Sequence, residues 1–429
     1  MPTADASIVP FRSRLLPDAE YADATIAVHA GNDPDPVTGS IVQPIVQSTS
    51  FAQRGVGDSP EFAYSRVSNP TVSALERALG ALEGSPQAVA FSSGLSATTS
   101  LFLALLKPGD EVLISDVVYG GTTRLLQQIL APLGVTSRWI DTSDSSAVSR
   151  AITDQTRLVF VESPANPTLK LTDIGEVARI TRARGVTLVV DNTFLTAVIQ
   201  RPLDLGADIT LYSTTKFIEG HNATVGGAIV TRDRSVLDRL RLIRKSLGTI
   251  QSPFEAWLTL RGIKTLPLRL REQSRSAGTL ARYLEAHPAV ARVHYPGLAS
   301  FAQADLSARQ HGAEVGGKPL HGAILAFEVK GGIEGARRLL SGVRLITVAE
   351  NCGAVESLLT HSATMTHADV PRDQREAAGI VDGLVRLSVG LEDVNDLIND
   401  LDGALEAVWR RERGDGSARS GALAGVAHA

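Results

Sequence analysis

The residue types and spacing that best suit covalent chemistry lie in the segment from Asp208 to Asn222. An apolar run ends there at Ser213, and Lys216 follows it, with Thr215 beside the lysine. Such a lysine suits a cofactor aldehyde: its amine forms an imine while the two hydroxyl groups hold the cofactor's phosphate. The alternative is that Lys216 is an ordinary surface lysine after a strand. This interpretation would be preferred if no other functional groups accompanied the lysine.

A carboxylate upstream supports the covalent interpretation. Asp191 ends another apolar run, 25 residues before Lys216. A buried carboxylate needs a cationic partner or costs several kcal/mol, and a protonated pyridine nitrogen supplies such a partner. The alternative is an aspartate that hydrogen bonds within the core.

Two further positions could contact a bound ring and its phosphate. Gly94 precedes a helical pattern, and a glycine at that turn lets backbone N–H groups at a helix N-terminus approach a phosphate. Tyr119 follows another predicted strand, where an aromatic side chain either lies flat on a heteroaromatic ring or fills a loop.

The elements that position these residues are short, β-branched apolar runs separated by helical patterns, which predict an α/β fold with a mostly parallel sheet. The predicted central strands are 111–116, 158–162, 187–191 and 208–213. In open α/β sheets ligands bind beyond the carboxyl ends of the strands. One crevice is therefore expected to gather the residues that follow them, namely Tyr119, Glu162, Asn166, Asp191, Ser213 and Lys216.

The remaining patterns predict the domain organisation. Residues 1–68 are rich in proline and poor in periodic segments, which predicts an extended arm that rests on a neighbouring subunit. A large cofactor-binding domain is expected over 69–267 and a smaller C-terminal α/β domain over 268–412. The Gly- and Ala-rich end, 413–429, is expected to be a flexible tail.

Composition narrows the class of partner. The 429 residues carry a net charge of −4, so no basic field favours nucleic acid or an anionic membrane, and a small-molecule partner is expected. The single cysteine, Cys352, excludes an internal disulfide. His361 and His367 match no common metal-ligand spacing, so no metal is expected. Without an apolar run of signal-peptide or membrane-span length, a cytoplasmic location is expected.

Taken together, these residues resemble the Cys/Met-metabolism family of pyridoxal-phosphate enzymes, the trans-sulfuration group. The resemblance extends over nearly the whole chain, and the 208–222 segment fits the family's lysine signature. Further matching segments are Tyr64-Ser65-Arg66, Asn69-Pro70-Thr71, Ser252-Pro253-Phe254, Arg261-Gly262, Lys264-Thr265-Leu266, Met365-Thr366-His367 and the run from Leu384 to Glu392. The resemblance implies the fold-type-I architecture of pyridoxal-phosphate transferases, with a large domain and a smaller C-terminal one.

It also implies pyridoxal 5'-phosphate as the cofactor, with Lys216 as the Schiff-base lysine and Asp191 as the partner of the ring nitrogen. Tyr119 is expected to stack on the ring and to exchange protons with the leaving group. The groups expected to hold the phosphate are the backbone of Gly94 and Leu95, the side chains of Ser213 and Thr215, and Tyr64 and Arg66 of the adjacent subunit. A guanidinium supplied by a neighbour makes the site shared, and the expected assembly is a homotetramer built from dimers.

On the substrate side, the resemblance implies that Arg386 binds the carboxylate of an amino acid, with Asn166 assisting. The alternative for Arg386 is a bridge to Glu392 at a strand edge. Glu350 and Asn351 are further expected substrate-binding residues. Glu162 is expected to hold the residues of the site in position without contacting the substrate or cofactor itself.

The activity implied is γ-elimination or γ-replacement on a sulfur amino acid, and cystathionine γ-lyase is the expected one. Gly121 stands where methionine γ-lyases usually have cysteine, and Glu350 could pair with the distal ammonium of cystathionine. Two departures are Asn351, where the family usually has serine, and Ala63, where cystathionine enzymes often carry an acid. Cystathionine γ-synthase, O-acyl-homoserine sulfhydrylase and then methionine γ-lyase are the alternatives, followed by a catalytically silent relative.

Overall fold

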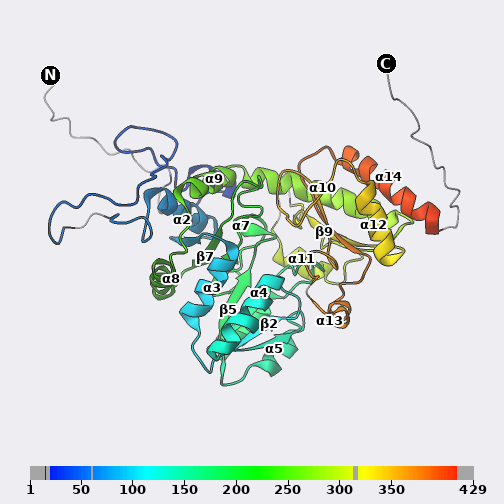
Figure 1. Ribbon diagram of the computed structural model, residues 1–429, viewed down its shortest axis with the longest axis horizontal. Coiled ribbons are helices and arrows are strands. Elements are labelled where there is room, and N and C mark those ends of the chain that lie inside the picture. The colour runs from blue at the N-terminus through cyan, green and yellow to red at the C-terminus, as the bar shows by residue number, and fades with distance from the viewer. Residues whose placement is uncertain (1–14, 16–19, 59–60, 313–316, 369, 413–429) are drawn as a thin grey trace, which may run out of the picture.

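The computed structural model describes residues 15, 20–58, 61–312, 317–368 and 370–412 (Figure 1). The predicted tail, 413–429, and most of the first nineteen residues of the expected arm lie outside the described residues. The large domain contains α1 (Asp23–His29), α2 (Pro70–Leu82), β1 (Ala88–Phe91), α3 (Gly94–Leu105), β2 (Glu111–Ser115), α4 (Gly120–Arg124), the π-helical η1 (Leu125–Leu130), the 3₁₀ turn η2 (Ala131–Leu133), β3 (Thr136–Ile140), α5 (Ser145–Ala151), β4 (Thr156–Glu162), α6 (Ile174–Ala183), β5 (Thr187–Asp191), α7 (Thr196–Ile199), β6 (Ile209–Tyr212), β7 (Gly227–Thr231), α8 (Arg234–Leu247) and α9 (Pro253–Ile263). The C-terminal part contains α10 (Leu266–Ala286), β8 (Val290–His294), α11 (Ala304–Gln310), β9 (Ile324–Val329), α12 (Gly332–Gly342), β10 (Thr347–Val348), β11 (Leu358–His361), α13 (Arg372–Ala377), β12 (Leu384–Ser388) and α14 (Val394–Glu412).

The large domain is built on a seven-stranded sheet in the order β1-β7-β6-β5-β4-β2-β3. The run from β3 to β6 is parallel, and β7 lies antiparallel to both β6 and β1. The four predicted central strands are all present, as β2, β4, β5 and β6, with ends within two residues of the prediction. The α/β fold with a mostly parallel sheet is therefore confirmed.

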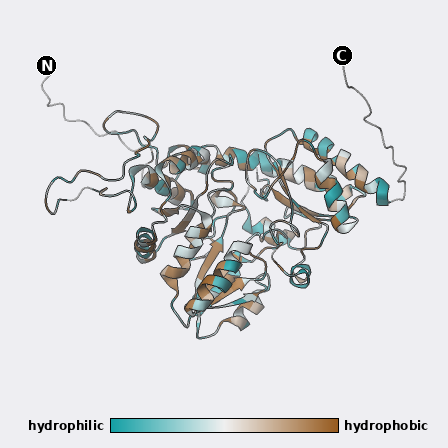
Figure 2. Cartoon of the chain, in the orientation of Figure 1, coloured by the Kyte–Doolittle hydropathy of each residue, from teal (hydrophilic) through white to brown (hydrophobic). Residues whose placement is uncertain are grey.

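Burial on both faces explains why these strands are nearly continuous apolar runs. In β2, Val112 and Ile114 pack on the face shared with α3, whereas Leu113 packs in the cluster on the α5 and α6 face. Figure 2 shows the resulting apolar strands enclosed by helices of mixed hydropathy. Because helices cover both faces of the sheet, a ligand can reach it only at the loops that follow the strand ends.

The C-terminal part contains a five-stranded sheet in the order β10-β11-β12-β9-β8. Its pairs are antiparallel except for β10 with β11, and α12 packs against α14 beside it (Figure 1). Because the long helix α10 begins at Leu266 and leads from the first sheet to the second, we propose its start as the domain border. The border expected from the sequence, near 268, stays a prediction.

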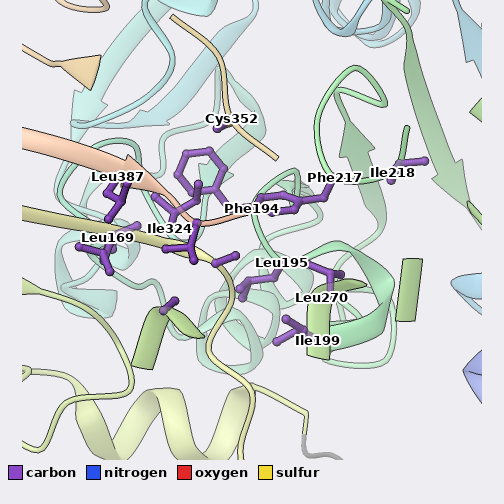
Figure 3. Packing of buried hydrophobic residues seen from close by; sticks show 14 of the residues in the cluster. Leu169, Phe194, Leu195, Ile199, Phe217, Ile218, Leu270, Ile324, Cys352 and Leu387 are labelled. Carbon is purple, nitrogen blue, oxygen red and sulfur yellow. The ribbon is translucent and has the colours of Figure 1, made fainter. Parts of the chain in front are cut away.

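A shared apolar core joins the two sheets next to the predicted lysine segment. Phe217, directly after Lys216, lies beside Phe194 in Figure 3, and both belong to one buried cluster with Cys352 and Leu387. The lysine loop is thus held between both domains rather than exposed at the surface. Cys352 is a buried free thiol, as expected.

The N-terminal region is only partly an extended segment. α1 packs against α2 and α10 and buries Ala27, whereas most of the following residues up to 69 belong to no helix or strand. Apolar side chains there are unusually exposed, with Val37 at 84% and Ile41 at 66%. Because such exposure is typical of surfaces that another chain covers, we propose that this region contacts a neighbouring subunit. None of the described helices has the length and apolar character needed to cross a membrane.

Candidate active site

A cavity of about 580 Å³ opens at the carboxyl ends of β2, β4, β5 and β6. Side chains from the loops after these strands meet segments of the C-terminal domain there. The sequence-predicted residues that line it are Gly94, Leu95, Tyr119, Glu162, Asn166, Asp191, Ser213, Thr215, Lys216, Glu350 and Arg386. The structure therefore brings together nearly all of the predicted site.

Lys216 lies in the turn after β6, where its backbone N–H donates to the Ser213 carbonyl at 3.3 Å. Its amine donates to Oδ1 of Asn351. The side chain is half-buried at the cavity wall and is not a free surface lysine.

The N-terminus of α3 forms an anion-binding corner beside the lysine loop. Ser93 caps the helix in a reciprocal bond with Ser96, and Gly94 is its first residue. A Cβ on Gly94 would lie 2.8 Å from Cβ of Ser213, so the close approach of helix and loop requires glycine. The first N–H groups of a helix lack partners within it and bind phosphate readily. This corner fits the phosphate of the cofactor inferred from the sequence.

Asp191 and Glu162 are paired in register on β5 and β4. Oδ1 of Asp191 accepts from the Thr193 backbone at 3.0 Å and from its hydroxyl at 2.6 Å. Burial raises the pKa of Asp191 to about 6. Among the described residues no cationic side chain forms an ion pair with Asp191, so a protonated ring nitrogen fits the charge it needs.

Glu162 organises two loops of the cavity through its carboxylate. Its two oxygens accept from the backbone N–H groups of Tyr119 at 2.8 Å and of Asn166 at 2.9 Å. Burial and the nearby Asp191 raise the pKa of Glu162 to about 8. The expected supporting position of Glu162 agrees with these contacts.

Tyr119 caps α4 at the cavity wall and remains 49% exposed. It is therefore not a residue that fills a loop. A Cβ on Gly121 would lie 2.4 Å from Cε1 of the Tyr119 ring. Glycine at 121 thus leaves room for the present position of the ring.

Arg386 is a buried residue of β12 whose guanidinium points toward the large domain. It donates to Oδ1 of Asn166 at 2.8 Å and to the backbone oxygen of Asn351 at 2.9 Å. The alternative bridge to Glu392 is absent, because that carboxylate accepts from Ser357. A fixed, buried guanidinium at a cavity wall is suited to binding a carboxylate.

Comparison with known proteins agrees with this geometry. Residues 24–406 match the family described as Cys/Met metabolism PLP-dependent enzyme. The chain belongs to this family. Its members are pyridoxal-phosphate-dependent enzymes of trans-sulfuration, which confirms the cofactor and the class of enzyme expected from the sequence.

The relatives of this chain are named for different activities, although their sequence identities to the chain are similar. Cystathionine γ-lyase of Mus musculus is 44% identical over 94% of this chain and 98% of its own length. Cystathionine β-lyase of Coxiella burnetii is 40% identical over 89% and 97%, and cystathionine γ-synthase of Mycobacterium bovis is 43% identical over 89% and 96%. The crystal structure of metB from Corynebacterium glutamicum has a TM-score of 0.87 and 41% identity, with 90% of this chain and 98% of that chain covered.

Two residues predicted for the family's phosphate site lie outside the cavity of this single chain. Arg66 donates to the Lys245 carbonyl at 2.7 Å, and its guanidinium carbon lies 5.2 Å from the centre of the Tyr64 ring. Neither side chain lines the cavity. Their contribution to a neighbour's site stays a prediction.

Among the cavity residues that the sequence did not single out as site residues, two carry basic side chains, Arg124 and His367. Arg124 ends α4, the short helix that follows Tyr119, and no ion-pair partner for it occurs among the described residues. His367 also lines the cavity, and burial together with Arg386 and Arg375 lowers its pKa to about 4. Arg124 could have been found from the sequence, because it lies only a few residues after Tyr119, which was predicted to face the site. The position of His367 depends on loop packing.

Proposed function

We propose that this trans-sulfuration enzyme acts on cystathionine and catalyses its γ-elimination. The observation that carries this proposal is Glu350, a carboxylate that lines the same cavity as Lys216 and Arg386. Glu350 forms no ion pair with any described residue, which leaves its charge to pair with a bound substrate. The name of the mouse relative, cystathionine γ-lyase, adds further support.

The two ends of cystathionine match the charges of the cavity. At the reacting end, Arg386 would bind the α-carboxylate, and Asn166 orients the guanidinium through its 2.8 Å bond. At the distal end the substrate carries a second ammonium and a second carboxylate. Glu350 and Arg124 supply the opposite charges for these two groups.

The cofactor, when bound, supplies an electron sink next to the substrate's Cα. Nζ of Lys216 would take the proton from Cα and then move protons at Cβ, because Lys216 lines the cavity together with Arg386 and Tyr119. Oη of Tyr119 would donate a proton to the departing sulfur. Asp191 would stabilise a positive charge at the ring nitrogen, and Gly94, Leu95, Ser213 and Thr215 would hold the phosphate.

The same residues could serve the β-lyase and γ-synthase reactions for which other relatives are named. Products distinguish them by mass spectrometry. γ-Elimination releases cysteine, 2-oxobutanoate and ammonia from cystathionine, whereas β-elimination releases homocysteine, pyruvate and ammonia. A synthase would form cystathionine from an O-acyl-homoserine and cysteine, and a sulfhydrylase would form homocysteine from the same ester and sulfide.

We expect cysteine and 2-oxobutanoate to be the main products, formed with a higher kcat/KM than any product from methionine. A protein that leaves cystathionine unchanged but uses an O-acyl-homoserine contradicts the proposal. A protein that uses none of these substrates contradicts the wider assignment and favours the silent relative. We further propose the homotetramer with shared sites, which sedimentation analysis tests.

A further inference from the structure

A chain of three polar side chains leads from the protein surface to the lysine amine. The carboxylate of Glu356 accepts from Nδ2 of Asn222 at 3.2 Å. Oδ1 of Asn222 accepts from Nδ2 of Asn351 at 2.6 Å. Oδ1 of Asn351 then accepts from the Lys216 amine. Each amide donates toward the surface and accepts from the interior.

The direction of these hydrogen bonds follows from the carboxylate of Glu356, which has no hydrogen to donate. An ionised carboxylate can only accept, so Glu356 forces Asn222 to present its NH₂ group outward and its oxygen inward. That oxygen in turn forces Asn351 to present its own oxygen to the lysine. Without a group that only accepts at the end of the chain, both amides could turn over.

The backbone holds the two asparagines in place. Asn222 has φ of 55°, a left-handed conformation that asparagine tolerates, and buried Glu219 fixes this turn by accepting from the backbone of His221 and Ala223. Opposite it, Val355 donates to the Gly220 carbonyl at 2.9 Å. A Cβ on Gly353 would lie 2.4 Å from the backbone nitrogen of Phe217, so the two segments touch directly.

We propose that Glu356, Asn222 and Asn351 are positioning residues that keep the Lys216 amine a hydrogen-bond donor. A neutral amine that donates to Asn351 keeps its lone pair free, and that lone pair performs both of its tasks. It attacks the cofactor aldehyde, and the condensation releases one water. It also accepts the proton from Cα of the substrate, which rests on the proposed function. If the Asn351 amide turned over, its NH₂ would donate to the lone pair and compete with both tasks.

The first readout is cofactor capture, which does not depend on any substrate. Cofactor-free protein is mixed with pyridoxal 5'-phosphate, and the uptake rate is followed by the absorbance of the lysine-linked cofactor. We expect Glu356→Gln and Asn351→Ser to slow uptake about two- to tenfold, the range of one hydrogen bond, because Asn222 and Glu356 are exposed and water competes. Glu334→Gln, on the exposed face of α12, is the matched control and should not change the rate.

The sign of the effect separates this proposal from a simple charge effect. If Glu356 acted only through its negative charge, its removal would lower the pKa of the amine, raise the fraction of free amine and speed uptake. Slower uptake supports the hydrogen-bond chain, and faster or unchanged uptake overturns it.

A second variant tests direction independently of local damage. In the double variant Glu356→Gln with Asn222→Asp, residue 222 only accepts, so Asn351 again presents its oxygen to the lysine. We expect the double variant to recover most of the uptake rate lost in Glu356→Gln. A double variant as slow as or slower than the single one overturns the proposal.

The second readout tests proton transfer with the substrate that the wild type uses. Cystathionine deuterated at Cα should give a larger isotope effect on kcat in Asn351→Ser than in the wild type, with KM changed less than kcat. An unchanged isotope effect contradicts the role in proton transfer. If the wild type uses no tested substrate, the proposed function fails, while the uptake experiment still decides whether the chain orients the amine.

Discussion

Glu162 and Asp191 stand opposite each other at the ends of adjacent parallel strands, β4 and β5, with their carboxylates in one buried site. Two backbone N–H groups satisfy the first, and Thr193 satisfies only one oxygen of the second. Glu162 therefore fixes two loops of the cavity, whereas the negative charge of Asp191 still lacks a cationic partner among the described residues. A cofactor with a protonated ring nitrogen supplies that partner.

This pair makes the stability of the cofactor-free protein depend on pH. Burial raises the pKa of Asp191 to about 6 and of Glu162 to about 8, so the folded state holds more protons than the unfolded state between about pH 4 and about pH 8. Stability is then full below the unfolded pKa values and falls as the pH rises through 6 to 8, by up to about 1.4 kcal/mol per pH unit for each proton. Denaturant unfolding of cofactor-free protein between pH 5 and 8.5 measures this slope.

Glu162→Gln should flatten the slope, although the loss of one acceptor for backbone N–H lowers stability at every pH. Glu176→Gln, on the exposed part of α6, is the control and should leave the slope unchanged. Equal slopes in Glu162→Gln and wild type would show that Glu162 is ionised throughout.

Lys216→Ala should abolish the absorbance of the lysine-linked cofactor and lower turnover by about 10²- to 10⁴-fold, the range of a positioned base. The thermal unfolding midpoint of the cofactor-free variant should change little, because the amine projects into the cavity and not into the core. Lys107→Ala, at an exposed loop, is the control. Turnover like that of the wild type in Lys216→Ala would remove the lysine from the reaction.

The central strands and the contents of the crevice could be predicted because buried parallel strands are continuous apolar runs, whereas the order of the strands in the sheet was not predicted. Polar residues after them, such as Glu162 and Asp191, must then meet at one edge of the sheet. The position of His367 depends on how a C-terminal loop packs, which no local pattern encodes. The same holds for the contacts of Asn351, whose amide bonds with Lys216 and Asn222, while its expected role in binding substrate stays a prediction.

Arg66→Ala tests the proposed shared site. If Arg66 holds a neighbour's phosphate, the variant should bind cofactor about ten- to hundredfold more weakly although its own lysine is intact, since a charged hydrogen bond contributes about 1.5 to 3 kcal/mol. Mixing it with Lys216→Ala subunits should restore part of the activity, because one site of each hybrid dimer then has both residues. Absence of recovery in hybrids verified by native mass spectrometry contradicts the sharing.

Glu350 provides the most selective test of the substrate. A carboxylate facing a partly desolvated ammonium contributes about 1.5 to 3 kcal/mol, which corresponds to about ten- to hundredfold in specificity. Glu350→Val should therefore lower kcat/KM for cystathionine by that factor and leave the value for methionine, which has no distal ammonium, unchanged or improved.

Two matched variants sharpen the result. Glu350→Gln keeps the shape of the side chain and should lose most of the same factor, because the lost interaction depends on charge. Arg124→Gln should lower kcat/KM for cystathionine in the same selective way if it binds the distal carboxylate. A loss shared equally by cystathionine and methionine would instead place Glu350 in the support of the cavity wall.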